Sequence, residues 1–102
     1  MKIAIVSTDG SAVNDHFGKA ERFLIYESDG APPVFIEERA VKSYSSGNKD
    51  HPFDQSRFDN VLAALSGCEK VYCNKIGNKP TEELNKAGIK PIIYEGPIAA
   101  IR

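Results

Sequence analysis

The stretch Ile3-Ala4-Ile5-Val6, closed by Ser7-Thr8-Asp9-Gly10, decides the fold of this chain. A strand that is apolar on both alternating faces is typical of a central strand, covered on both sides of its sheet. The run has four residues, which is far too short for a membrane span or the apolar core of a secretory signal. We therefore expect a buried central strand in a cytoplasmic protein.

Four more runs predict strands, at residues 22–27, 34–43, 70–76 and 89–94. The Asp29-Gly30 pair between the first two of these runs is typical of a hairpin connection. Residues 44–52 show no periodicity and are rich in turn-forming residues, so we expect a loop there.

A period of 3.6 residues indicates helices in the second half of the chain. Apolar side chains recur at helical spacing between residues 58 and 65, with Asp54 available to cap the start and Gly67 to end the helix. A short helix is expected over residues 81–87, after Pro80, and a last one from Gly96-Pro97 to the end.

The order of these elements fixes a topology. Strands joined through a helix normally run parallel with a right-handed crossover, so the first, fourth and fifth strands should be parallel. The second and third strands should fold back as an antiparallel meander. The result is an α/β fold with a five-stranded mixed sheet of order 3-2-1-4-5 flanked by helices, whose ligands gather at the carboxyl ends of the parallel strands.

Composition excludes several classes of protein. The chain has 102 residues, which suffices for one domain over 1–102, and 41% are apolar against 26% charged, as in an ordinary globular protein. Its formal charge of −1 argues against a dedicated binder of duplex nucleic acid. No phosphate-binding loop, dinucleotide fingerprint or nucleophile elbow occurs in the sequence.

The carboxyl edge of the predicted sheet brings together one histidine and one cysteine. His16 lies in the loop after the first strand, and Cys73 lies near the exit of the fourth. Imidazole and thiolate suit zinc, copper or an iron–sulfur species rather than calcium or magnesium. Two ligands do not close a structural zinc site, but they suit a preassembled cluster that keeps most of its coordination shell. Cys68 lies at the opposite end of that strand, too far from Cys73 for a disulfide.

Each candidate has a plainer interpretation. His16 is also compatible with a loop histidine that only bonds the backbone, and Cys73 with a small buried apolar residue. Phe17 fits a core residue, and Asp9 and Asp15 fit turn or capping residues. Three lysines and a helix N-terminus at one edge predict a cationic rim, while acids such as Glu37, Glu38, Glu82 and Glu83 are expected elsewhere. The three are Lys19, Lys75 and Lys79.

Two segments of the chain resemble the dinitrogenase iron–molybdenum cofactor-binding family. They are NDHFGKAERF at 14–23 and CEKVYCNKIGNKP at 68–80, and the resemblance continues to Ile98. The most specific element is His16-Phe17-Gly18. The family includes NifX-like carriers and the C-terminal domain of some NifB cofactor-synthesis enzymes, and the resemblance implies a ribonuclease-H-like three-layer fold. It also makes His16 the leading cluster ligand and strengthens the case for Cys73.

The resemblance implies a carrier rather than an enzyme. It would hold an iron–sulfur or iron–molybdenum type cluster for exchange between donor and acceptor proteins, using His16, Phe17, Gly18, Cys73 and the three lysines. Relatives often carry a cysteine after the tyrosine of the long loop, where this chain has Ser45. An interaction or regulatory module with an idle site is therefore the alternative. A nuclease fits poorly, because the first strand offers no carboxylates for a pair of metal ions.

Overall fold

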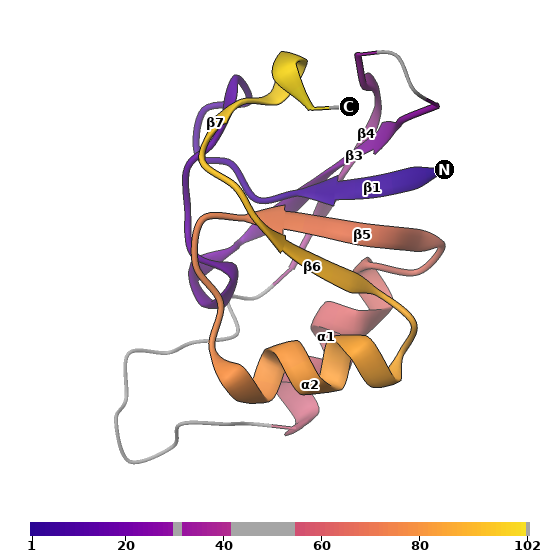
Figure 1. Cartoon of the computed structure of the whole chain (residues 1–102). Helices are drawn as coiled ribbons and strands as arrows, with labels where there is room; N and C mark the ends of the chain where they lie inside the picture. The colour runs from indigo at the N-terminus through magenta and orange to yellow at the C-terminus, as the bar shows by residue number, and fades with distance from the viewer. Residues whose placement is uncertain (30–31, 42–54, 102) are drawn as a thin grey trace.

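The computed structural model describes residues 1–29, 32–41 and 55–101 (Figure 1). The expected loop at 44–52 and the expected helix cap Asp54 lie outside these residues, as do Ser45 and His51. The five strands of the main sheet are β1 (Lys2–Ile5), β3 (Arg22–Glu27), β4 (Val34–Ala40), β5 (Cys68–Cys73) and β6 (Lys90–Ile93).

The sheet has the order β4-β3-β1-β5-β6, with β1 at its centre. In the numbering of the expected strands this is 3-2-1-4-5. β1 pairs antiparallel with β3 and parallel with β5, and β5 pairs parallel with β6. Ile3, Ala4, Ile5 and Val6 are all at most 1% exposed, so the apolar run is covered on both faces of the sheet.

Both α-helices pack on the same face of the sheet (Figure 1). They are α1 (Gln55–Ala64) and α2 (Asn78–Lys86). Phe58, Val61 and Leu65 supply the apolar face of the first helical segment, and Leu84 supplies that of the second. They bury the side chains that alternate strand residues, such as Ala4 and Val71, present to this face. Gly67, with φ 84°, ends the first helical segment as expected.

The opposite face of the sheet is covered by irregular structure and a small ribbon. β2 (Ala12–Val13) pairs antiparallel with β7 (Gly96–Pro97), and a 3₁₀ turn, η2 (Ile98–Ala100), follows. The prediction of a helix opening at Gly96-Pro97 is therefore wrong. Gly96 has φ 147° and Pro97 has ψ 136°, so the chain stays extended at these two residues. Only Ile98–Ala100 form a helical turn.

The ends of the elements differ from the sequence-based bounds by a few residues. β5 begins at Cys68 and ends at Cys73, three residues before the expected end, because the chain then bends toward α2. The second helix begins at Asn78, three residues before its expected start, so Pro80 lies in its first turn, where its missing N–H costs nothing. No helix in the described ranges is long and apolar enough to cross a membrane.

Candidate functional site

Backbone hydrogen bonds fix the segment that carries His16 beside the end of β5. His16 forms an isolated parallel bridge with Lys75, in which the Phe17 N–H donates to the Lys75 carbonyl at 2.9 Å. The Asn74 N–H donates to the Asp15 carbonyl at 3.0 Å. The His16 N–H donates to the Asp15 carboxylate at 2.8 Å. The carboxyl ends of β1 and β5 therefore meet at this segment, as the topology predicted.

Phe17 anchors the same segment in the core. It begins a 3₁₀ turn, η1 (Phe17–Lys19), and its ring is 1% exposed. The ring centroid lies 6.0 Å from that of Phe23 and 6.3 Å from that of Phe58. The interpretation of Phe17 as a core residue is confirmed, and its buried ring is positioned to hold its neighbour rather than to contact a ligand.

The side chain of His16 has different surroundings from that of Phe17. It is half-buried, and its imidazole does not cap η1. Within the described part of the chain, the imidazole makes no hydrogen bond or ion pair. An imidazole that is half-buried and has no partner among the described residues, on a backbone fixed at both neighbours, is of the kind that can offer a nitrogen to a metal.

Asp9 and Asp15 act as turn residues in this structure. The Asp9 carboxylate accepts the N–H groups of Ser11 at 2.8 Å and Ala12 at 3.1 Å, and these hydrogen bonds lower its pKa. Asp15 accepts the His16 N–H, as described above. Both carboxylates therefore shape the loop that leads from β1 to the His16 segment.

Cys73 lies beside this segment, but its thiol belongs to the core. The side chain is 0% exposed and packs in the cluster between the sheet and the helices. Burial raises its pKa to about 11, although hydrogen bonds from the Lys75 and Phe17 N–H groups act in the opposite direction. At neutral pH the group is a protonated thiol, and thiolates are the form that binds metals. Cys68 begins β5, also buried and free, so the two cysteines lie at opposite ends of the strand as expected.

The three lysines of the expected rim are exposed, and a carboxylate lies beside one of them. The ammonium of Lys79 lies 3.9 Å from the carboxylate of Glu83, one turn along α2. Lys19 lines a pocket that Glu38 also lines. The expectation that Glu83 lies away from the rim is therefore wrong, because helical spacing brings it beside Lys79. Glu38 lines the pocket from β4, where it pairs with Arg22. Lys75 is exposed at the end of β5, beside His16.

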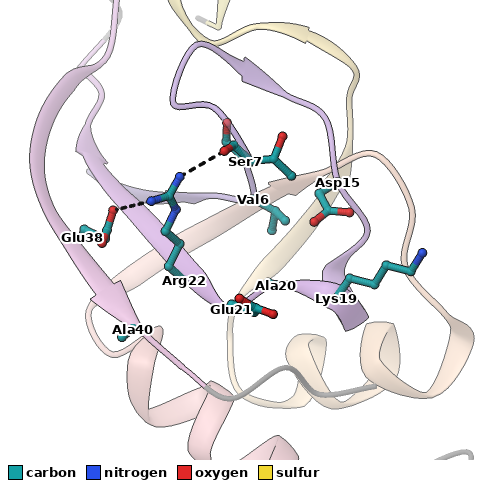
Figure 2. A pocket seen from close by; sticks show the side chains of 10 residues that line it. Val6, Ser7, Asp15, Lys19, Ala20, Glu21, Arg22, Glu38 and Ala40 are labelled. Carbon is teal, nitrogen blue, oxygen red and sulfur yellow. Dashed lines mark hydrogen bonds and ion pairs between the residues drawn. The ribbon is translucent and has the colours of Figure 1, made fainter. Parts of the chain in front are cut away.

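A pocket of about 430 Å³ opens next to the His16 segment (Figure 2). It lies between the residues that follow β1, the start of β3 and the end of β4. Figure 2 shows Arg22 extending across it, where the guanidinium donates to the Glu38 carboxylate at 3.1 Å and to the Thr8 carbonyl at 3.2 Å. The lining holds three carboxylates and two cations, so its charge is mixed. Its residues are Val6, Ser7, Thr8, Asp15, Lys19, Ala20, Glu21, Arg22, Glu38 and Ala40.

Two further polar residues at this edge were missed by the sequence reasoning. Asn74 follows the last residue of β5, and its amide nitrogen donates to the Glu95 carboxylate at 3.3 Å. The carbonyl oxygen of the Asn74 side chain is buried and has no hydrogen-bond partner. The signal for Asn74 was its position beside Cys73, in the last part of a predicted strand at the carboxyl edge.

The described residues contain no group of three or more histidine, cysteine, aspartate or glutamate side chains arranged to hold a metal ion. A bare ion therefore finds no complete set of ligands in this part of the chain. A preassembled cluster needs fewer protein ligands, because its own sulfides supply most of the coordination of each metal.

A family sequence model described as dinitrogenase iron-molybdenum cofactor matches residues 1–101. The chain belongs to this family. It is 39% identical over 89 residues to the FeMo cofactor biosynthesis protein NifB of Azotobacter vinelandii. These residues cover 87% of this chain and 18% of that protein. It is 30% identical over 100 residues to protein NifX of Sinorhizobium fredii, covering 97% of this chain and 62% of that protein.

The chain spans about a fifth of the length of the NifB relatives that it matches. Solved structures of similar fold include the crystal structure of PH0822, with a TM-score of 0.69 and 25% identity over 97% of this chain and 84% of that one. An NMR structure of a NifB-type protein from Thermotoga has a TM-score of 0.61 and 24% identity, with coverage of 95% and 79%. The family is described by the dinitrogenase iron-molybdenum cofactor, and the NifB relatives are named as FeMo cofactor biosynthesis proteins.

Proposed function

We propose that this domain binds a preassembled iron–sulfur or iron–molybdenum type cluster at the carboxyl edge of its sheet and passes it to an acceptor protein. The observation that carries the proposal is the imidazole of His16. It has no hydrogen-bond partner among the described residues, while hydrogen bonds on both sides fix its backbone. A ligand held in this way binds without first losing another interaction.

The proposal gives His16 and Cys73 unequal roles. His16 is the primary ligand, because a neutral imidazole binds a metal without losing a proton. Cys73 would have to leave the core and lose its proton, against a pKa of about 11. We therefore assign it to the wall beneath the site, where Phe17 and Gly18 set the path of the His16 segment. Weak attachment through one ligand suits a carrier, since its cargo must also leave.

The lysines at this edge supply the charge balance. Clusters of these types carry negative charge, and exposed ammonium groups at Lys19, Lys75 and Lys79 attract it at moderate ionic strength. The partners would be a protein that donates the cluster and one that accepts it. We place the exchange in the cytoplasm, where free cysteines such as Cys68 and Cys73 stay reduced. The role is that of a binding protein and not of a catalyst.

One observation favours the alternative of an interaction or regulatory module with an idle site. The described residues lack a three-ligand group, and the thiol nearest to His16 is buried and protonated at neutral pH. In that case the fold would present a surface to a protein partner, and the imidazole would serve no metal.

Anaerobic titration of the protein with a synthetic, thiolate-ligated [4Fe–4S] cluster separates the two functions. We expect a one-to-one complex in the absorbance spectrum, in which the His16 imidazole displaces one thiolate of the cluster. His16→Ala should weaken this complex at least tenfold, which corresponds to about 1.4 kcal/mol of binding free energy. The other histidine, His51, provides the matched control His51→Ala, which should bind as the wild type does. Equal and weak binding by all three proteins would favour the interaction module.

A further inference from the structure

Asn74 carries a polar atom that the folded chain leaves unsatisfied. In the described ranges, its Oδ1 is the single buried side-chain nitrogen or oxygen without a hydrogen-bond partner. The other end of the carboxamide, Nδ2, donates to Glu95 at 3.3 Å, a long hydrogen bond in an exposed position. A buried acceptor without a donor opposes folding, and native proteins rarely keep one without a reason.

Exchange of the two ends of the carboxamide does not relieve this cost. The carbonyl would then face the carboxylate of Glu95, and two N–H groups would be buried without an acceptor. Glu95 therefore determines the orientation of the side chain. The resting position of Asn74 satisfies one end of the carboxamide weakly and the other end not at all.

The backbone places Asn74 at the proposed site. Its N–H donates to the carbonyl of Asp15, which belongs to the peptide unit that joins Asp15 to His16. Asn74 also follows Cys73 directly at the end of β5. The carboxamide and the imidazole are thus carried by two adjacent, hydrogen-bonded segments at one edge of the sheet.

We infer that Asn74 is a ligand-contacting residue of this site, whose carboxamide turns from Glu95 and donates a hydrogen bond to an anionic ligand. The inference rests on the proposed function and adds a specificity contact to it. The sulfides of a cluster accept hydrogen bonds but donate none, so the amide Nδ2 is the end that recognises them. The turn gives up one weak, exposed hydrogen bond and returns the unsatisfied oxygen to water.

Removing the carboxamide should separate stability from binding. Asn74→Ala deletes an unsatisfied buried acceptor together with one long, exposed hydrogen bond to Glu95, so the urea midpoint of the ligand-free protein should stay the same or rise. Binding of the same [4Fe–4S] cluster should weaken about tenfold, as expected for a hydrogen bond to a charged group. The matched control for stability is Asn14→Ala, which removes a carboxamide oxygen that has a partner. This oxygen accepts the Thr8 N–H at 2.9 Å. The urea midpoint of Asn14→Ala should therefore be lower than that of the wild type.

A second variant acts on the partner of Asn74. Glu95→Gln removes a negative charge and weakens the competing acceptor, so cluster binding should become tighter. A lower urea midpoint for Asn74→Ala would show that the residue is structural and overturn the inference, as would weaker binding by Glu95→Gln. Wild-type binding that depends on His16 but is unchanged in Asn74→Ala would overturn the inference alone. No binding by the wild type would overturn the proposed function as well.

Discussion

His16 and Phe17 are adjacent residues with opposite surroundings, and the site depends on this contrast. The ring of Phe17 is buried among other aromatic rings, whereas the imidazole of His16 has no partner in the described part of the chain. The sequence indicated both residues, because they lie in a long polar connection after the first strand, at the edge where ligands gather, and in the motif that resembles the family. The orientation of Phe17 toward the helices could be established only from the packing.

Cys73 shows what spacing alone cannot predict. Its place at the end of a strand at the carboxyl edge was confirmed, and this position made a ligand role plausible. Alternation along β5 turns its side chain toward the helices, where burial raises the pKa. Whether a strand residue faces the open edge or the core depends on register, which a six-residue strand with apolar residues on both faces does not reveal.

The raised pKa of Cys73 makes stability depend on pH in a definite direction. Its pKa is about 11 in the folded protein against 9.0 for a free thiol. The folded state therefore holds this proton more tightly, so the contribution is complete below pH 9 and is lost as the pH rises toward 11. The loss amounts to at most about 3 kcal/mol.

Urea unfolding at pH 8 and pH 10.5 measures this loss. The decrease in unfolding free energy should be smaller in Cys73→Ala than in the wild type, because the variant has no thiol to titrate there. Cys68→Ala, at the other end of β5, should retain most of the wild-type decrease. Identical decreases in the wild type and Cys73→Ala would mean that the thiol is not buried.

At the scale of elements, the C-terminal segment supports the loop that leads to His16. β7 pairs with β2, and the Ile98 N–H donates to the Ser11 carbonyl at 2.9 Å. Ile98 and Ile101 are 4% and 3% exposed and cover the second face of the sheet. The sequence did not predict this ribbon, since two residues per strand show no periodicity and their pairing joins residues more than eighty positions apart.

Truncating Ile98 should loosen this ribbon. Ile98→Ala should lower the unfolding free energy by about 2–4 kcal/mol, the usual cost of removing a buried isoleucine side chain. Hydrogen exchange should rise first at residues 11–13, and later or not at all in β1 and β5. The control Ile93→Ala removes the same atoms from a side chain that is 61% exposed, and it should change neither quantity much. A uniform rise of exchange in Ile98→Ala would contradict local support of the loop.

At the scale of the whole molecule, the sheet topology was predictable and the distribution of charge was not. Buried apolar runs predict the strands, and helical periods predict the helices between them. The right-handed crossover, which is nearly universal in α/β proteins, then indicates how the strands are arranged in the sheet. The total charge of −1 gives no information on location. The pairing of β3 with β4 brings Glu38 beside Arg22 at the pocket, a contact between residues 16 positions apart. Local sequence patterns do not contain such contacts.

Lys75 and Lys90 offer a test of the role of charge at the edge. Lys75 follows β5 at the carboxyl edge, and Lys90 begins β6 at the amino edge. Lys75→Gln should weaken cluster binding several-fold at low salt, whereas Lys90→Gln should leave it unchanged, because exposed charges act over about 10 Å at 0.1 M salt. The difference should shrink at 1 M salt. Equal effects of the two variants would mean that only net charge matters.

The most direct test of the account is whether a nitrogen of His16 binds the metal. Pulsed EPR of the reduced protein–cluster complex detects a directly coordinated imidazole through its ¹⁴N coupling to the electron spin. We predict that the wild type and His51→Ala show this coupling and that His16→Ala lacks it. A wild-type complex without the coupling, or a His16→Ala complex that retains it, would contradict the proposal that His16 holds the cluster.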